Sequence, residues 1–165
     1  MQQIQNKIKS LFRSPNFVPD KPSLVNMDGY DELEKGSAVE FFRGKNVGGI
    51  LKHLQNDGPY YLDEWTVLKL DAIIHYAPAY FSYLIESLES KEPEEEFVFF
   101  FIGALYQLTY IHKGSPFSSA QTDLIIELVE LAVENSKDQA RFEYFSDDIQ
   151  DNAKEFRDEL NKYSD

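Results

Sequence analysis

Asp71 and His75 are the residues of this chain whose types and spacing come nearest to a catalytic or metal-binding pair. They stand four positions apart, so a helix would place both side chains on one face, where they could bind one metal ion or share one proton path. No third ligand has a matching spacing, and His75 directly precedes the segment Tyr76-Ala77-Pro78. We therefore expect a packed, hydrogen-bonded histidine, and we predict no catalytic site, bound metal or cofactor.

Two further motifs invite a chemical interpretation. Gly44-Lys45, with Gly48-Gly49 after it, could suggest a phosphate loop, but the glycine spacing differs from G-x-x-x-x-G-K-[ST] and no strand precedes it. Ser115 and Ser118 have neither the G-x-S-x-G context nor a paired base, so they are predicted to be turn and cap residues. These patterns favour a protein that is not an enzyme.

Carboxylates form two rows on the last two predicted helices. Like charges one turn apart destabilise a helix by a few tenths of a kcal/mol per pair. Lys154, Arg157 and Lys162 relieve the second row in part, whereas we expect no base to relieve the first row. The members, at spacings of three and four, are Asp123, Glu127, Glu130 and Glu134 in the first row and Asp148, Asp151, Glu155, Asp158 and Glu159 in the second.

Two interpretations of these rows remain open from the sequence. One is a solvated acidic face without a partner. The other is a docking surface for a basic protein, because complementary charge speeds encounter and sets specificity. In that second interpretation an exposed aromatic residue such as Tyr144 would serve as an anchor.

The charge of the whole chain agrees with a basic partner. The formal net charge is −13, and it is concentrated in the C-terminal two thirds: residues 1–58 are near neutral, 59–117 carry −6 and 118–165 carry −8. Nucleic acid and anionic membranes both require cationic contact, so we expect neither as a partner. The absence of cysteine and of an apolar leader at the N-terminus predicts a cytoplasmic protein.

The element that must position these groups is the run Phe97–His112. It is apolar on every side, which predicts a helix that is buried on every side. It is shorter than a membrane span and contains Gln107 and Thr109. We therefore expect it to be the central helix of a water-soluble domain rather than a helix in a bilayer.

Other apolar residues recur at helical spacing, and no segment alternates as a strand would. The prediction is an all-α fold: a single domain over 1–165, built as a bundle of about six to eight helices around 97–112. The prolines of 14–25 make a linker, so the helix at 2–13 either lies apart from the core or folds back over it.

The expected boundaries follow from cap and breaker residues. We expect one short helix at 29–35, capped by Asp28 and ended by Gly36, and a second that starts at Ser37. A helix should open at Asp63, and Pro78 should either interrupt it or begin a new one. Later helices should start at Ser118 or Ser119 and at Ser146, the last with Ile149, Ala153, Phe156, Leu160 and Tyr163 inside.

Three short segments carry a resemblance: Phe41-Phe42-Arg43-Gly44-Lys45, Gly58-Pro59-Tyr60-Tyr61-Leu62 and His75-Tyr76-Ala77-Pro78-Ala79-Tyr80-Phe81. They resemble a family of small uncharacterised bacterial proteins that have a Phe-x-Gly-Lys element and then a Tyr-Leu-Pro-Ala-Tyr element, with Ala77 in place of that leucine. The match covers about residues 40–88. The resemblance implies a small helical protein and supplies no catalytic residues.

More loosely, this short, acidic, cysteine-free chain is similar to the immunity proteins of contact-dependent growth inhibition systems. That similarity implies an inhibitor that binds a cognate toxin, often a nuclease, and blocks its basic cleft. The alternatives are a non-catalytic helical regulatory or scaffold protein, which could self-associate through exposed rings, and an enzyme that uses Asp71 and His75.

Overall fold

The computed structural model describes residues 2–12, 32–57 and 62–163, and this part of the chain is helical and contains no strand. The all-α prediction is therefore confirmed. The helices are α1 (Gln2–Leu11), α3 (Glu32–Phe42), α4 (Val47–Asp57), α5 (Leu62–Thr66), α6 (Leu70–Glu89), α7 (Glu95–His112), α8 (Ser119–Ser136) and α9 (Ser146–Asn161).

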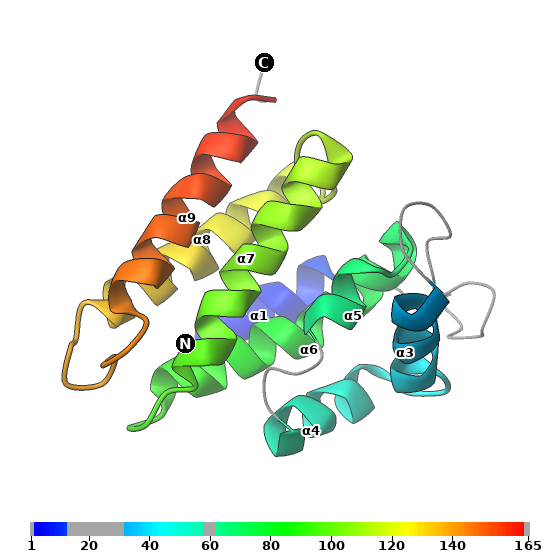
Figure 1. Ribbon diagram of the computed structural model, residues 1–165, viewed down its shortest axis with the longest axis horizontal. Helices are drawn as coiled ribbons and strands as arrows, with labels where there is room; N and C mark the ends of the chain where they lie inside the picture. The colour runs from blue at the N-terminus through cyan, green and yellow to red at the C-terminus, as the bar shows by residue number, and fades with distance from the viewer. Residues whose placement is uncertain (1, 13–31, 58–61, 164–165) are drawn as a thin grey trace.

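The helices form a bundle in which α7 has a central place. It packs against α9 on one side and against α5 and α6 on another, while α8 lies behind α9 (Figure 1). α3 and α4 lie at the far end of the molecule from α9, where α4 packs on α6. None of the described helices meets the length and apolarity that a membrane-spanning helix requires.

The core is built from aromatic rings of α5, α6 and α7. The Trp65 ring stacks on Tyr80, with centroids 4.6 Å apart, and on Phe101 at 6.1 Å, and Phe81 meets Trp65 edge-on. The Trp65 indole N–H donates to the Ile73 carbonyl at 3.1 Å, so its one polar atom is satisfied inside the core. Rings of this size remove about 150–250 Å² each from water, so this cluster contributes strongly to stability.

The prediction that the 97–112 helix is buried on all sides is wrong. One side of α7 is buried, including Phe101 and Leu105, but Phe100 is 46% exposed and Tyr110 61% exposed. The helices that pack on α7 are chiefly α5, α6 and α9, and they leave an outward strip of the helix uncovered. A helix that is apolar on every side becomes buried on every side only where other elements of the fold cover all of its faces.

Helix α1 folds back over the core. Phe12, directly after the helix, meets Phe81 edge-on at 5.0 Å and Phe117 at 6.0 Å, and Ile8 is 1% exposed. The Gln121 amide of α8 also donates to the Leu11 carbonyl at 2.9 Å. The alternative in which this helix lies apart is wrong, and the predicted linker at 14–25 lies outside the described residues.

Two predicted breaks are absent and one appears where none was expected. α3 runs through Gly36 and Ser37 as one helix, while the proposed cap Asp28 lies outside the described residues. α6 runs through Pro78 without interruption, because large side chains on both sides of it, such as Tyr76 and Phe81, are fully buried and their packing opposes the local cost of about 3 kcal/mol. The helix expected from Asp63 onward is divided into α5 and α6.

The two predicted serine caps have different outcomes. Ser118 caps α8 with a full capping box: its hydroxyl accepts from the Gln121 N–H, and its own N–H donates to the Gln121 side chain at 3.0 Å. Ser146 is not the cap of α9, because Phe145 holds that position and the Ser146 hydroxyl donates to the Ser136 carbonyl at 2.7 Å.

The inner face of α9 was predicted with one error. Ile149, Ala153 and Phe156 are buried as expected and Leu160 is partly buried. Tyr163 is 42% exposed, because α9 ends at Asn161 and Tyr163 lies beyond that end.

Candidate protein-binding surface

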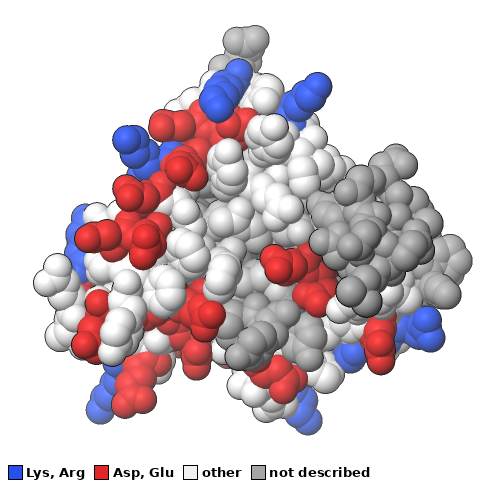
Figure 2. Space-filling view, in the orientation of Figure 1, with Lys and Arg blue, Asp and Glu red and all other residues white. Residues whose placement is uncertain are grey.

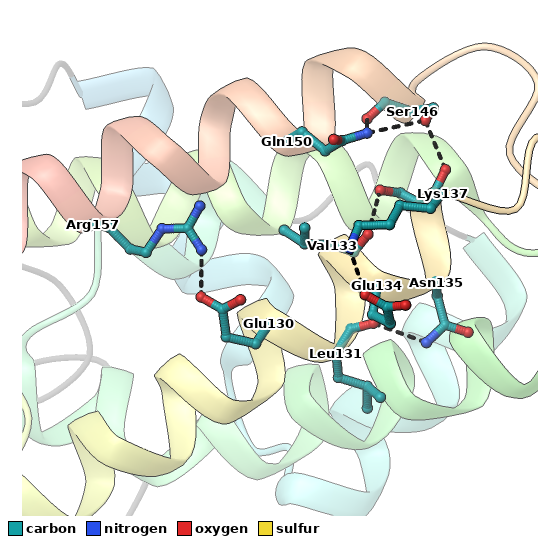
Figure 3. A network of polar contacts seen from close by, with 10 residues as sticks. Glu130, Leu131, Val133, Glu134, Asn135, Lys137, Ser146, Gln150 and Arg157 are labelled. Atoms are coloured by element: carbon teal, nitrogen blue, oxygen red, sulfur yellow. Dashed lines mark hydrogen bonds and ion pairs between the residues drawn. The ribbon is translucent and has the colours of Figure 1, made fainter.

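The four carboxylates of Asp123, Glu127, Glu130 and Glu134, which we call the α8 row, lie along one face of α8. Three of them have cationic partners from other parts of the chain. Glu127 pairs with Lys7 of α1 at 2.7 Å, Glu134 pairs with Lys137 at 2.6 Å, and Glu130 pairs with Arg157 of α9. Figure 3 shows the last two pairs in the space between α8 and α9.

The prediction that no base relieves the α8 row is therefore wrong. Lys7 lies 120 positions from Glu127 in the sequence, and Arg157 lies 27 positions from Glu130, so helical spacing within α8 could not reveal either pair. Each pair is partly solvent-exposed and contributes about 0–1 kcal/mol, but each provides a local counterion for its carboxylate. In the α8 row only Asp123 lacks a described ion pair.

The carboxylates of Asp148, Asp151, Glu155 and Asp158, which we call the α9 row, have a different environment. All four are exposed, and none forms an ion pair with another residue in the described ranges. Glu159, which the spacing placed in the same row, is 2% exposed and pairs with Lys162 at 2.5 Å. Glu159 is therefore part of the helix packing and not of the acidic surface.

Two members of the α9 row, Asp148 and Glu155, lie on the flank of α9 that is attached to α7. On one flank of α9, the Asn152 amide donates to the Phe99 carbonyl of α7 at 3.3 Å. On the other flank, Arg157 reaches Glu130 of α8. Asp148 and Glu155 stand four residues before and three residues after Asn152, so they lie on the flank toward α7.

The loop before α9 is held in place by a carboxylate of α7. The two oxygens of Glu95 accept hydrogen bonds from the backbone N–H groups of Glu143, Tyr144 and Phe145, each at 2.9 Å. Three converging N–H groups form an anion-binding concavity at the start of a helix. The carboxylate of Glu95 occupies this concavity and fixes the loop to α7.

Arg141 fastens the other end of the same loop. Its guanidinium donates to the backbone carbonyls of Leu88 and Ser90, at 2.6 and 2.7 Å, and to the Asn135 side chain at 3.2 Å. Guanidinium groups suit this role because they offer several donors in a fixed plane. Sequence inspection missed the roles of both Glu95 and Arg141, since neither lies near its partners in the chain.

The fastened loop presents Tyr144 to solvent. The ring is 74% exposed, the largest value among the exposed large hydrophobic residues of the described chain. The negative charge of Glu143, together with a hydrogen bond to it, raises the pKa of the Tyr144 phenol. Tyr144 also borders an open hollow of about 550 Å³, lined by Gln139, Phe142, Glu143, Tyr144, Ser146, Asp147 and Asp148.

The residues considered for catalysis lie elsewhere. Asp71 is exposed in the first turn of α6, and His75 is half-buried with its ring edge-on to Tyr76 at 4.7 Å. Burial lowers the pKa of His75, so its neutral form is favoured. In the described part of the chain, no three histidine or carboxylate side chains gather in a way that could hold a metal ion.

The two motifs behind the family resemblance pack against each other inside the fold. The ring of Phe42 lies 4.7 Å from that of Tyr76, and the Tyr76 hydroxyl donates to the Lys45 carbonyl at 2.8 Å. Gly44 has a φ of 68°, which glycine adopts without strain. The Lys45 ammonium turns back to donate to the Phe41 carbonyl, so these motifs have a structural explanation.

The comparisons with known proteins give no relative. No family model, no curated protein and no solved structure matches this chain. The chemistry of the surface is therefore the basis for a functional assignment.

Proposed function

We propose that this protein is an immunity protein, a non-catalytic inhibitor that binds the basic cleft of a cognate toxin domain such as a nuclease. The observation that carries the proposal is the α9 row, whose carboxylates have no ion-pair partner in the described chain. A net charge of −13 strengthens the same attraction at long range. The proposed contact residues are the α9 row and Tyr144.

The ion pairs seen in the structure separate the predicted contact residues into a paired α8 row and an unpaired α9 row. Glu127, Glu130 and Glu134 already have cationic neighbours, so a partner would have to displace Lys7, Arg157 or Lys137 to use them. The α9 row requires no such displacement. Tyr144 supplies a large ring beside it, and tyrosine is enriched among residues that dominate interface energies.

The assay measures binding to the toxin domain encoded beside this gene, by calorimetry and by rescue of growth. D151K/E155K should weaken binding by about 30-fold or more at low salt, because two attractive charges become repulsive. The control is E40K/D57K, which makes the same change of charge on α3 and α4, at the other end of the molecule (Figure 1).

Two outcomes would overturn the proposal. The first is equal binding by D151K/E155K and by the wild-type protein. The second is the absence, in the neighbouring reading frames, of any secreted protein with a basic C-terminal domain.

A further inference from the structure

The outward side of α7 carries an uncharged strip, apolar except for one glutamine, that no described helix covers. We call Phe100, Gln107, Tyr110 and Ile111 the α7 strip. These residues recur at helical spacing over about 16 Å of the helix, and Phe100, Tyr110 and Ile111 are among the exposed large hydrophobic residues of the chain. α7 itself contains no lysine or arginine.

Aromatic contacts extend the strip toward Tyr144. The Phe100 ring lies 5.1 Å from that of Phe99, and the Phe99 ring lies 5.3 Å from that of Phe145 at the start of α9. Phe145 directly follows Tyr144, whose ring is open to solvent. At the other end of the strip, Tyr110 stacks near Tyr106 at 6.3 Å.

The α9 row runs beside this strip. Figure 2 shows an uncharged band along the middle of this face and carboxylates along the side where α9 lies. Asn152 and Glu95 attach α9 and its preceding loop directly to α7, so the acidic and apolar groups lie on neighbouring helices with a fixed separation. The combination is an apolar band with negative charge along one edge.

We propose that the α7 strip and the α9 row together form a docking surface for a cationic amphipathic helix of a partner protein. Such a helix would place its apolar face on Phe100, Tyr110 and Ile111 and its lysine or arginine edge on the α9 row. Helices recognised in this way carry apolar anchors at spacings of three, four and seven residues. This inference rests on the proposed function, since it specifies the chemistry of the element that the basic partner inserts.

Charge distinguishes this occupant from a second copy of the chain. Two copies that met through this face would bring their α9 rows close together, and α7 has neither lysine nor arginine to compensate. Like charges in an interface are costly, so the surface favours a partner of opposite charge.

The experiment uses the full chain and two fluorescent peptides. Both have about 14 residues of leucine and lysine, but only the first has its leucines on one helical face, and the second is a scramble of the same composition. Anisotropy at low salt should show the patterned peptide binding at least about tenfold more tightly than the scramble, because apolar anchors contribute beyond charge. Equal binding by the two peptides, or no binding by the first, would overturn the inference.

Variants of the α7 strip test whether the patterned peptide binds there. F100S/I111S should weaken binding of the patterned peptide by about tenfold while the protein stays folded, because both side chains are about half exposed. L70S removes another exposed apolar side chain, on α6, and should leave binding unchanged. If F100S/I111S binds like the wild type, or if the wild type forms dimers that F100S/I111S abolishes, the proposed occupant is wrong.

Measuring toxin binding by the same variants tests the docking surface and the immunity function separately. A toxin domain that binds wild type and F100S/I111S equally would contradict the docking surface and leave the immunity function standing. Binding of the patterned peptide with no toxin binding would contradict the immunity function and leave the docking surface standing.

Discussion

The α8 row and the α9 row have nearly the same sequence pattern and opposite environments. Both place carboxylates at spacings of three and four along one helix. In the α8 row three members meet bases, from α1, from α9 and from the end of α8 itself. In the α9 row no member does so within the described chain. The difference teaches that a row of like charges becomes a candidate binding surface only when tertiary neighbours leave it uncompensated.

Four predictions test this comparison. The largest effect is expected from a variant that would make the α8 row resemble the α9 row. Phe12 anchors α1 on the core, so Phe12→Ala should destabilise the protein by about 3 kcal/mol, through loss of transfer free energy and creation of a cavity. Urea unfolding measures the change, and hydrogen exchange should show that α1 opens first.

The opened helix has a consequence for Glu127. When α1 leaves α8, Lys7 leaves Glu127, and Glu127 joins Asp123 as an unpaired carboxylate. Lys7→Ala is the matched control, because it removes the same ion pair and keeps Phe12 in the core. A Phe12→Ala variant as stable as the wild type would show that α1 does not depend on this anchor.

The second prediction concerns the attachment of the α9 row. Glu95→Ala should destabilise the protein by about 2 kcal/mol, because three backbone N–H groups lose a charged acceptor. Amide exchange of Glu143, Tyr144 and Phe145 should accelerate. Glu96→Ala changes the neighbouring exposed carboxylate and should cost less than about 0.5 kcal/mol. Similar losses in the two variants would refute the anchoring role of Glu95.

The third prediction compares the two rows directly. The neutral variant E127Q/E130Q/E134Q should lose about 1–2 kcal/mol of stability, since three ion pairs disappear. D151N/E155Q/D158N should gain about 0.5 kcal/mol, because repulsion between charges one turn apart is relieved. Both shifts should shrink at high salt, where exposed charges are screened. Shifts of the same sign would break the comparison.

The smallest effect concerns the Tyr144 phenol. Because the charge of Glu143 raises the pKa of Tyr144, Glu143→Gln should lower that pKa toward its ordinary value, and the phenol should then ionise at a lower pH. A titration followed by NMR of the Tyr144 ring measures the change, and Glu40→Gln is the distant control. An unchanged Tyr144 pKa in Glu143→Gln would show that the two groups do not interact.

Several elements of the fold could be predicted because their signals are local. The helix start at Ser118 and the apolar face of α9 each depend on residues within a few positions of one another. The positions at which helices are interrupted were predicted poorly. Gly36 and Pro78 are weak helix formers, but long-range packing of large buried neighbours, such as Tyr76 and Phe81 beside Pro78, outweighs that local preference.

The features of the candidate site also fall into those with local signals in the sequence and those that depend on distant contacts. The helical class, the acidic charge and the spacing of both carboxylate rows could be predicted from the residues alone, because these are properties of composition and of a period of 3.6 residues. Only the tertiary structure decided that Lys7 and Arg157 compensate the α8 row, that Glu95 holds the loop bearing Tyr144, and that Phe100 stays exposed. Those outcomes depend on contacts between residues far apart in the chain, which no local period encodes.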